Sequence, residues 1–452
     1  MNKHLIQAAA FAVAMFVGGS VFASDNEALV NALVKKGILT GQEGEEIRSE
    51  LLTQSLTSAY GKFNTKADSA VVKLTLFGDV RLRYQWENDG GNFGDVGGNN
   101  DRSRWRYRLR AGAVYEFTDN FKSVVRFETG GSNDSTNTNF GGYFDKTNDD
   151  IYVGQAYLEW ENNDIFDSGL VDYANFAFGK QNMIKRFMMQ KAWWDGDINP
   201  EGITAQLGWD DIFTDGLDFT LRGGAFITHE VREDRAPTSG DSDSFLGVYQ
   251  AEVKYSWASK THFAFAPTAL IEFGDKQAQG IGGETMENGG SVASENESDA
   301  SGEMLVLMVP MQFKYKAFGF SQSTYGTVGY NLDAGSRADF EMASGDDAVA
   351  NGEGGLFFNV GHKFGKAKEK GTWEMGAEYR YIEEAAYTTN LVDSDWNKAE
   401  RGAHGVVVKA KYAITDNIYG GVAWLHAQNL ESDDAEDPDY SNIVQVDLNW
   451  KF

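Results

Sequence analysis

The sequence contains no cysteine among its 452 residues. A chain without cysteine has neither a disulfide framework nor a thiolate metal site, and it offers no thiol nucleophile and no lipoprotein anchor. Proline is also scarce, with 5 residues against 51 glycines and 30 phenylalanines. This balance favours a large all-β protein over helical or disulfide-rich classes.

Basic surface is lacking as well, because the formal net charge is -27 at pH 7. Contacts to nucleic-acid phosphates need a basic surface, so we expect no nucleic-acid partner. Beyond the N-terminus, no apolar run approaches the roughly 20 residues of a membrane-spanning helix. Any membrane insertion of the mature chain must therefore use β-strands.

The N-terminus has the pattern of a secretory signal peptide. Lys3 supplies a basic start, an apolar run extends from Leu5 to Val17, and small residues lead to Ala23. We expect cleavage after Ala23, which removes residues 1–23. A transmembrane anchor is the alternative, but the run is shorter than the ~20 residues that a spanning helix needs.

Residues 24–58 read as two short helices. The first closes at Gly37, and Thr40 with Glu43 forms a capping box that opens the second. A small helical pair that packs on itself or on a neighbour is one interpretation. A tether, an oligomerisation element and a lumen plug are the others. We expect residues 59–71 to be a linker.

From residue 72 to residue 452 the chain is a series of strands in which apolar and polar residues alternate with period two. The expected strands span 72–86, 104–117, 121–129, 151–160, 173–180, 203–209, 217–229, 245–257, 262–273, 304–316, 318–330, 356–364, 373–382, 405–414, 418–428 and 443–452. The prediction is therefore a barrel of about sixteen strands. Pro267 and Pro310 each remove a ladder donor, so we expect a bulge or a break there.

The connections alternate between long and short. Tight links such as "TDN" (118–120) and "ASKT" (258–261) are separated by polar, glycine-rich links such as "ENDGGNFGDVGGNND". Long loops on one rim and short turns on the other are typical of a transmembrane, antiparallel, up-and-down β-barrel. The faces agree, since in "FLGVYQAEVKYSW" Tyr249, Ala251 and Val253 oppose Gln250 and Glu252. A polar interior of this width predicts a water-filled channel.

The final strand, "IVQVDLNWKF", carries outward Trp450 and ends on Phe452, which resembles the signal that barrel-assembly machinery recognises in outer-membrane proteins. With "NALVKKGILTGQEGEEI", "LFGDVRLRY" and "WWDGDINPEGI", it makes the mature chain similar to the putative porin family of Gram-negative outer membranes. The resemblance implies a general-porin-like passive channel for small hydrophilic solutes, with no cofactor. It also implies contact with outer-membrane lipid and lipopolysaccharide, a periplasmic location for residues 24–58 and, by analogy, a homotrimer.

The candidate pore-lining residues are arginines of the first strands. Parity places a set of seven on the inner face: Arg81, Arg83, Arg104, Arg106, Arg108, Arg110 and Arg126. Antiparallel pairing brings such rows side by side, where like charges repel. They either serve permeation or pair locally with Asp79, Glu116 or Glu128.

The link from Gln181 to Gly202 is unusually apolar, so we expect it to fold inward. By analogy with sixteen-stranded general porins it is the constriction loop, and it would present Asp195, Asp197 and Glu201 to the arginines. Opposed charges of this kind predict a weak anion preference. Asp195, Asp197 and Asn199 have calcium-loop spacing, but Pro200 replaces the required glycine, so we expect no metal.

Two other functions are alternatives to a channel. An outer-membrane enzyme is one, but the histidines are scattered and have no serine elbow or metal-type pair beside them. They are His229, His262, His362, His404 and His426. A structural barrel that anchors the envelope is the other, and it would show no conductance.

Overall fold

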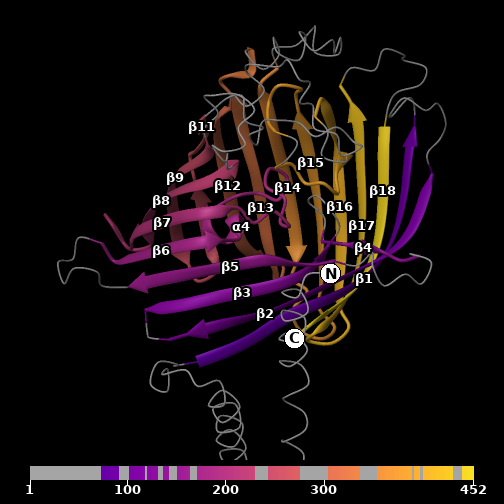
Figure 1. The fold of residues 1–452 in the computed structure, drawn as a ribbon, viewed down its shortest axis with the longest axis horizontal. Helices are drawn as coiled ribbons and strands as arrows, with labels where there is room; N and C mark the ends of the chain where they lie inside the picture. The colour runs from indigo at the N-terminus through magenta and orange to yellow at the C-terminus, as the bar shows by residue number, and fades with distance from the viewer. Residues whose placement is uncertain are drawn as a thin grey trace, which may run out of the picture. The chain divides into compact units, whose positions relative to one another are not determined.

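In the computed structural model the chain forms a closed antiparallel β-barrel (Figure 1). The structure describes residues 73–90, 101–117, 120–130, 136–141, 150–162, 171–229, 243–274, 304–335, 354–388, 391–397, 401–430 and 440–452. Residues 1–71 are one unit and 72–452 another. The expected signal peptide, helical extension and linker lie outside the described residues. In the described part of the chain, every helix is too short or too polar to cross a membrane.

The strands follow one another around the barrel. They are β1 (Lys73–Gly90), β2 (Arg102–Glu116), β3 (Phe121–Gly130), β4 (Thr138–Asn139), β5 (Asp150–Asn162), β6 (Tyr173–Lys180), β7 (Glu201–Trp209), β8 (Leu217–His229), β9 (Ser244–Ala258), β10 (Thr261–Phe265), β11 (Thr268–Gly274), β12 (Leu305–Ala317), β13 (Phe320–Asn331), β14 (Leu356–Gly365), β15 (Trp373–Ile382), β16 (Ala403–Ala413), β17 (Ile418–Asn429) and β18 (Tyr440–Lys451). A short helix, α4 (Met183–Arg186), lies in the link between β6 and β7.

Sixteen strands span the wall, as predicted. The sheet has eighteen strand elements, but β4 has two residues, and β10 and β11 are halves of one interrupted strand that both pair with β9 and β12. The barrel closes where β1 pairs with β18, for example at Leu82 and Leu448. Figure 1 shows this seam as the indigo first strand beside the yellow last strand.

The two strand prolines behave differently. Pro267 lies in the gap between β10 and β11, so the expected break occurs there. The expectation for Pro310 was wrong, because β12 runs through it without interruption. Ala266 N donates to Pro310 O at 2.9 Å, so the edge of Pro310 that lacks an N–H faces the gap in the neighbouring strand. The single gap between β10 and β11 therefore lies where both Pro267 and Pro310 lack an N–H donor.

The outer face is apolar and is banded with aromatic residues. Leu82, Val422 and Val446 are exposed there, in keeping with a lipid-facing wall. Near the long loops the ring centroids of Tyr84 and Trp105 are 5.1 Å apart. Near the short turns further rings gather, in the pairs Trp160–Phe176, Trp209–Phe219, Trp257–Phe313, Phe364–Trp373 and Trp450–Phe452.

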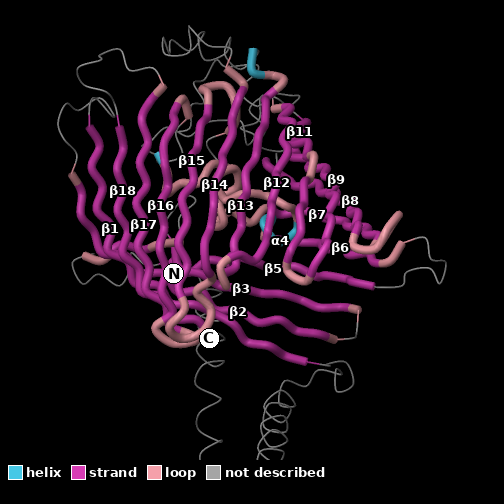
Figure 2. The backbone as a smooth tube through the Cα atoms, turned by 180° about the vertical axis from the view of Figure 1, so that it is seen from behind, coloured by secondary structure: helices cyan, strands magenta, loops and turns pink. Residues whose placement is uncertain are grey.

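Long and short links alternate along most of the chain, as predicted. Figure 2 shows the wall from behind, with β12 to β18 side by side and short connections at one rim. The link of residues 163–172 is an exception, because it is as long as the 430–439 link of the other rim. In the two-residue turn Phe318–Gly319 both φ angles are positive, 53° and 81°, as a type I′ hairpin requires.

Candidate functional site

Strands β1 and β2 place arginines directly opposite one another on the inner face. The register pairs Arg81 with Arg108 and Arg83 with Arg106. The alternate residue Leu82 is 44% exposed on the outer face, which fixes the inward direction of its neighbours. Like charges at opposed positions repel, so this arrangement needs compensation.

Carboxylates on the same wall supply much of that compensation. Asp79 accepts from Arg108 Nη2 at 2.7 Å and from Arg110 Nε at 2.6 Å. Arg126 lies 2.7 Å from Glu128. The local pairings expected for Asp79 and Glu128 are therefore present. Separately, Arg104 pairs with Glu87, whereas Glu116 pairs with Lys73 rather than with an arginine.

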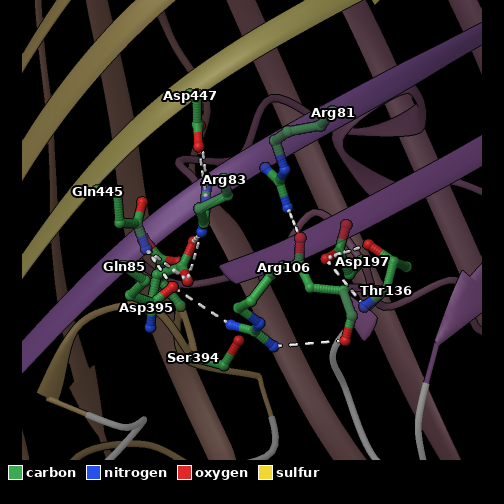
Figure 3. A network of polar contacts seen from close by, with 12 residues as sticks. Arg81, Arg83, Gln85, Arg106, Thr136, Asp197, Ser394, Asp395, Gln445 and Asp447 are labelled. Carbon is green, nitrogen blue, oxygen red and sulfur yellow. Dashed lines mark hydrogen bonds and ion pairs between the residues drawn. The ribbon is translucent and has the colours of Figure 1, made fainter. Parts of the chain in front are cut away.

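Arg83 joins the wall to an inward-folded link (Figure 3). Its guanidinium donates to both carboxylate oxygens of Asp447 on β18, at 2.8 and 3.0 Å. It also donates to Asp395 at 3.2 Å, and Gln445 donates to the same carboxylate at 2.9 Å. Asp395 belongs to the 383–402 link, so a residue 312 positions away in sequence meets the arginine rows.

Arg81 and Arg106 both reach Asn137, which lies just before β4. Arg81 donates to the side-chain oxygen of Asn137, and Arg106 Nη2 donates to its carbonyl oxygen at 3.4 Å. Arg106 Nη1 also donates to Gln85 Oε1 at 3.3 Å. The link between β3 and β5 therefore contributes to the same polar network.

The link of residues 181–200 folds inward, as its apolar sequence predicts. Its base is fixed to β5 by Arg186, whose guanidinium donates to both oxygens of Glu159 at 2.9 Å. Further along, Trp193 is 1% exposed, and its Nε1 donates to Asn359 Oδ1 on β14 at 2.8 Å. The link therefore extends from β5 and β6 to the wall at β14.

The link of residues 383–402 also folds inward, which the sequence analysis missed. Tyr387 donates to Trp193 O at 2.8 Å, and Trp396 Nε1 donates to His426 O at 3.1 Å. Ser394 donates to Asp195 from its backbone N at 2.9 Å and from Oγ at 2.6 Å. The sequence does carry a signal for this inward fold, namely a set of apolar residues in the link. They are Ala385, Ala386, Tyr387, Leu391, Val392 and Trp396, and all are buried.

The sequence matches the family described as putative porin over residues 38–301 and 317–452. The chain belongs to the putative porin family. Among solved structures, this porin is similar to OprB of Pseudomonas putida at high pH, with a TM-score of 0.50 and 11% identity over 87% of this chain and 97% of that chain. It is also similar to Salmonella typhi OmpF in complex with daunomycin, with a TM-score of 0.45 and 11% identity over 86% and 99%. No curated protein matches the sequence.

Identities this low show only the fold, whereas the family match covers most of the chain. Together they make this porin an outer-membrane β-barrel channel. The sequence-based assignment to the family is thereby confirmed.

The three acids expected at the constriction of this porin have different environments. Asp197 approaches the arginine rows, 3.9 Å from Arg110, and accepts from Thr136 Oγ1 at 2.8 Å (Figure 3). Asp195 turns away from the arginines towards Ser394. Glu201 needs a correction, because it begins β7 rather than ending the loop.

Glu201 shares the outward parity of Ile203, which is 53% exposed, and its side chain lies 3.4 Å from Lys180. It therefore does not face the lumen. The residue that takes its place in this porin is Asp395, since that carboxylate contacts Arg83.

Burial raises the pKa of the loop carboxyls of this porin, and neighbouring charges add to that effect for Asp195 and oppose it for Asp197 and Asp395. Burial, with Asp393 and Asp197 nearby, raises the pKa of Asp195 to about 6. Burial alone would raise the pKa of Asp395, but Arg83 and Arg81 outweigh it and lower that pKa. Arg108 and Lys191 likewise lower the pKa of Asp197 against its burial. Asp197 and Asp395 therefore stay ionised under conditions in which Asp195 takes up a proton.

The residues with calcium-loop spacing turn to separate partners. Asp195 accepts from Ser394 and Asp197 from Thr136, while Asn199 Oδ1 accepts from Gln155 Nε2 at 3.0 Å. Within the described ranges, no group of three histidine or acidic side chains converges on a common point where an ion could bind.

Phe452 closes the seam of the barrel in this porin. Gly78 N donates to Phe452 O at 3.0 Å, and Phe452 N donates to Gly78 O at 3.1 Å. A Cβ at Gly78 would lie 2.5 Å from the Phe452 ring, so the ring packs directly over the glycine. Trp450 is 49% exposed on the outer face, with its ring centroid 5.1 Å from that of Phe452. Their role as an assembly signal stays a prediction.

Proposed function

We propose that the chain forms a water-filled channel for the passive diffusion of small polar and charged solutes across the outer membrane. The distribution of side chains supports this. Exposed apolar residues such as Val446 and Leu448 cover the outer face, whereas Arg83, Gln445 and Asp447 line the inner face at the same level. A wall that is polar inside and apolar outside is stable around water in a bilayer.

The observation that carries the proposal is the contact between the inward links and the arginine rows. Asp395 and Asp197 come from two different links and both approach arginines of β1 and β2. Fixed charges of opposite sign on facing elements create a field across the lumen. Screening is incomplete over such distances, because the Debye length is ~8 Å at physiological salt.

We propose that the channel prefers anions weakly at this site. Most of the arginines have a carboxylate partner, as Arg108 and Arg110 have in Asp79, so little unbalanced positive charge remains there. Our proposal that the seven arginines line the pore rests on their inward direction and on these contacts.

Other elements of the proposal concern the surroundings of the barrel. We infer a periplasmic location for residues 24–58, a homotrimer, contact with lipopolysaccharide and delivery by barrel-assembly machinery. Membership of a porin family supports these inferences.

Planar-bilayer recording tests the channel. The purified, refolded protein should give discrete conductance steps and a reversal potential on the anion side in a KCl gradient. Absence of conductance in correctly folded protein would favour the structural anchor instead.

The site is tested by charge changes in the same recordings. R106E/R108E should shift the reversal potential towards cations, and D197N/D395N should shift it towards anions. D195N is the matched control, because Asp195 turns to Ser394 and should leave the potential nearly unchanged. If neither double variant moves the potential beyond the control, these residues do not line the constriction.

A further inference from the structure

A row of lysines crosses the inner wall from β12 to β16. The register aligns Lys314 with Ser323, Ser323 with Lys363, Lys363 with Gly376, and Gly376 with Lys409. The three lysines therefore lie in register on alternate strands, with a serine and a glycine between them. We call Lys314, Lys363 and Lys409 the lysine row.

The side chains of the lysine row point into the lumen. The alternate residues Val360 and Val408 are exposed on the outer face, at 54% and 38%, which sets the opposite direction for Lys363 and Lys409. The small residues between the lysines leave room for their stems. A Cβ at Gly376 would lie 3.1 Å from Lys363 Cγ, so a larger residue there would crowd that stem.

The lysine row is not neutralised in the way that the arginine rows are. Among the described residues, no carboxylate lies within the 4.0 Å ion-pair distance of Lys314, Lys363 or Lys409. The Lys363 ammonium lies 5.0 Å from the centroid of the Tyr325 ring. The adjacent acid Glu378 is already bound to Arg380 at 2.9 Å.

Other charged groups lie near the row, among them Glu252, Lys254 and Lys366 near Lys314. Lys411 follows Lys409 on the same inner face of β16, and its ammonium lies 5.8 Å from the Tyr419 ring centroid. Glu374 is opposite Lys411 in the register. Asp393 and Asp395 also lie near Lys409, but Asp393 is bound to Arg380 at 3.0 Å and Asp395 to Arg83 at 3.2 Å. Both acids are therefore already paired with arginines.

The row is a diagonal path rather than a ring. Lys314 lies close to the short-turn end of β12. The same register continues from Lys409 through Ala423, Gln445 and Gln85 to Arg104, which lies close to the long-loop end of β2.

Barrel geometry gives the dimensions of this path. Strands tilt by about 40° to the barrel axis and lie ~4.8 Å apart. The four strand steps from β12 to β16 therefore cover roughly 19 Å measured perpendicular to the strands. Because of the tilt, that line rises roughly 12 Å along the barrel axis. Neighbouring lysines are about 9.6 Å apart, close to the Debye length of ~8 Å, so their fields overlap.

The path ends at the network already described. Gln445, in register with Lys409 through Ala423, donates to Asp395 at 2.9 Å, and Asp395 contacts Arg83. An anion that follows the row thus arrives at the arginines beside the inward links.

We propose that the lysine row guides small dianions of the phosphate class along the lumen between the short-turn rim and the Arg83–Asp395 network. The inference rests on the proposed channel function. A dianion gains twice the electrostatic energy of chloride from the overlapping fields, so the row favours it over monovalent ions.

Bilayer recordings with potassium phosphate at pH 8, where phosphate is mainly dianionic, test the proposal. K314Q/K409Q removes two charges of the row. A unit charge about 10 Å away in water changes the local concentration of a monovalent ion about two-fold. We therefore expect the phosphate-to-potassium permeability ratio to fall at least about four-fold.

Two variants serve as controls. K368Q/K370Q removes the same charge from the exposed turn between β14 and β15 and should leave the ratio close to wild type. K314R/K409R keeps the charge and should keep the ratio.

The outcomes separate the two proposals. Wild-type protein that does not conduct overturns the channel itself. A conducting protein in which K314Q/K409Q behaves like K368Q/K370Q overturns the lysine row and leaves the channel intact. If heat-modifiability shows that the double variant does not fold, K314Q and K409Q are recorded singly, and an unchanged ratio in both overturns the row.

Discussion

Trp193 connects an inward link to Asn359 on the barrel wall, through an Nε1 hydrogen bond of 2.8 Å. The carbonyl oxygen of the same tryptophan accepts from the hydroxyl of Tyr387 at 2.8 Å. Trp193 lies in the 181–200 link, Tyr387 lies in the 383–402 link, and Asn359 lies on β14. One buried residue therefore holds both inward links against the wall.

Trp193→Ala should loosen both links. Truncating a buried tryptophan costs roughly 3–5 kcal/mol, and the change also leaves Asn359 without its donor. We expect a lower thermal midpoint and a larger, noisier single-channel conductance.

Trp424→Ala is the control for Trp193→Ala, because Trp424 is 43% exposed on the outer face. It should leave the conductance unchanged. Identical conductance in wild type and Trp193→Ala would show that the links do not narrow the lumen.

The contact between the two links should weaken as the pH rises. Asp195 has a pKa of about 6 in the folded protein against 3.8 normally, so it binds its proton more tightly when the links are packed. Packing is therefore favoured below about pH 4 and loses stability as the pH rises through about 6. Hydrogen exchange of the Ser394 amide, corrected for intrinsic rates, should show about tenfold lower protection at pH 7 than at pH 5.

Asp195→Asn should remove this pH dependence, because the amide does not titrate. Equal dependence in wild type and in this variant would assign the effect to another group.

Asp79→Asn should strengthen anion preference. Asp79 is the partner of both Arg108 and Arg110, so the substitution leaves one uncompensated positive charge on the inner wall. The anion-to-cation permeability ratio should rise about two-fold. Glu116→Gln is the matched control, since Glu116 pairs with Lys73 and not with an arginine. A ratio that rises equally in both variants would contradict a local effect of Asp79.

Phe452→Ala should reduce the yield of assembled barrel. The substitution removes the ring that packs over Gly78 at the seam and, if the terminal residue is the assembly signal, the feature that the machinery recognises. The heat-modifiable fraction in outer-membrane preparations measures the effect. Val446→Ala, on the outer face of the same strand, is the control. A normal yield for Phe452→Ala would contradict the assembly role.

The sequence by itself determined the barrel, because alternation with period two is a local property of each strand. The strand Trp373–Ile382 occurs with the predicted bounds, and β6 and β8 do as well. The inward direction of Arg83 followed from parity alone. Family membership followed from motifs spread along the chain, and the family match confirms it.

Only the tertiary structure decided which charges meet. Asp395 lies 312 residues from Arg83, and its approach depends on the packing of Tyr387 and Trp396 inside the barrel. Likewise, Lys314 and Lys409 align only through the pairing of five successive strands. A strand's own pattern fixes which face a side chain takes, but its level along the wall is set by hydrogen bonds to its neighbours.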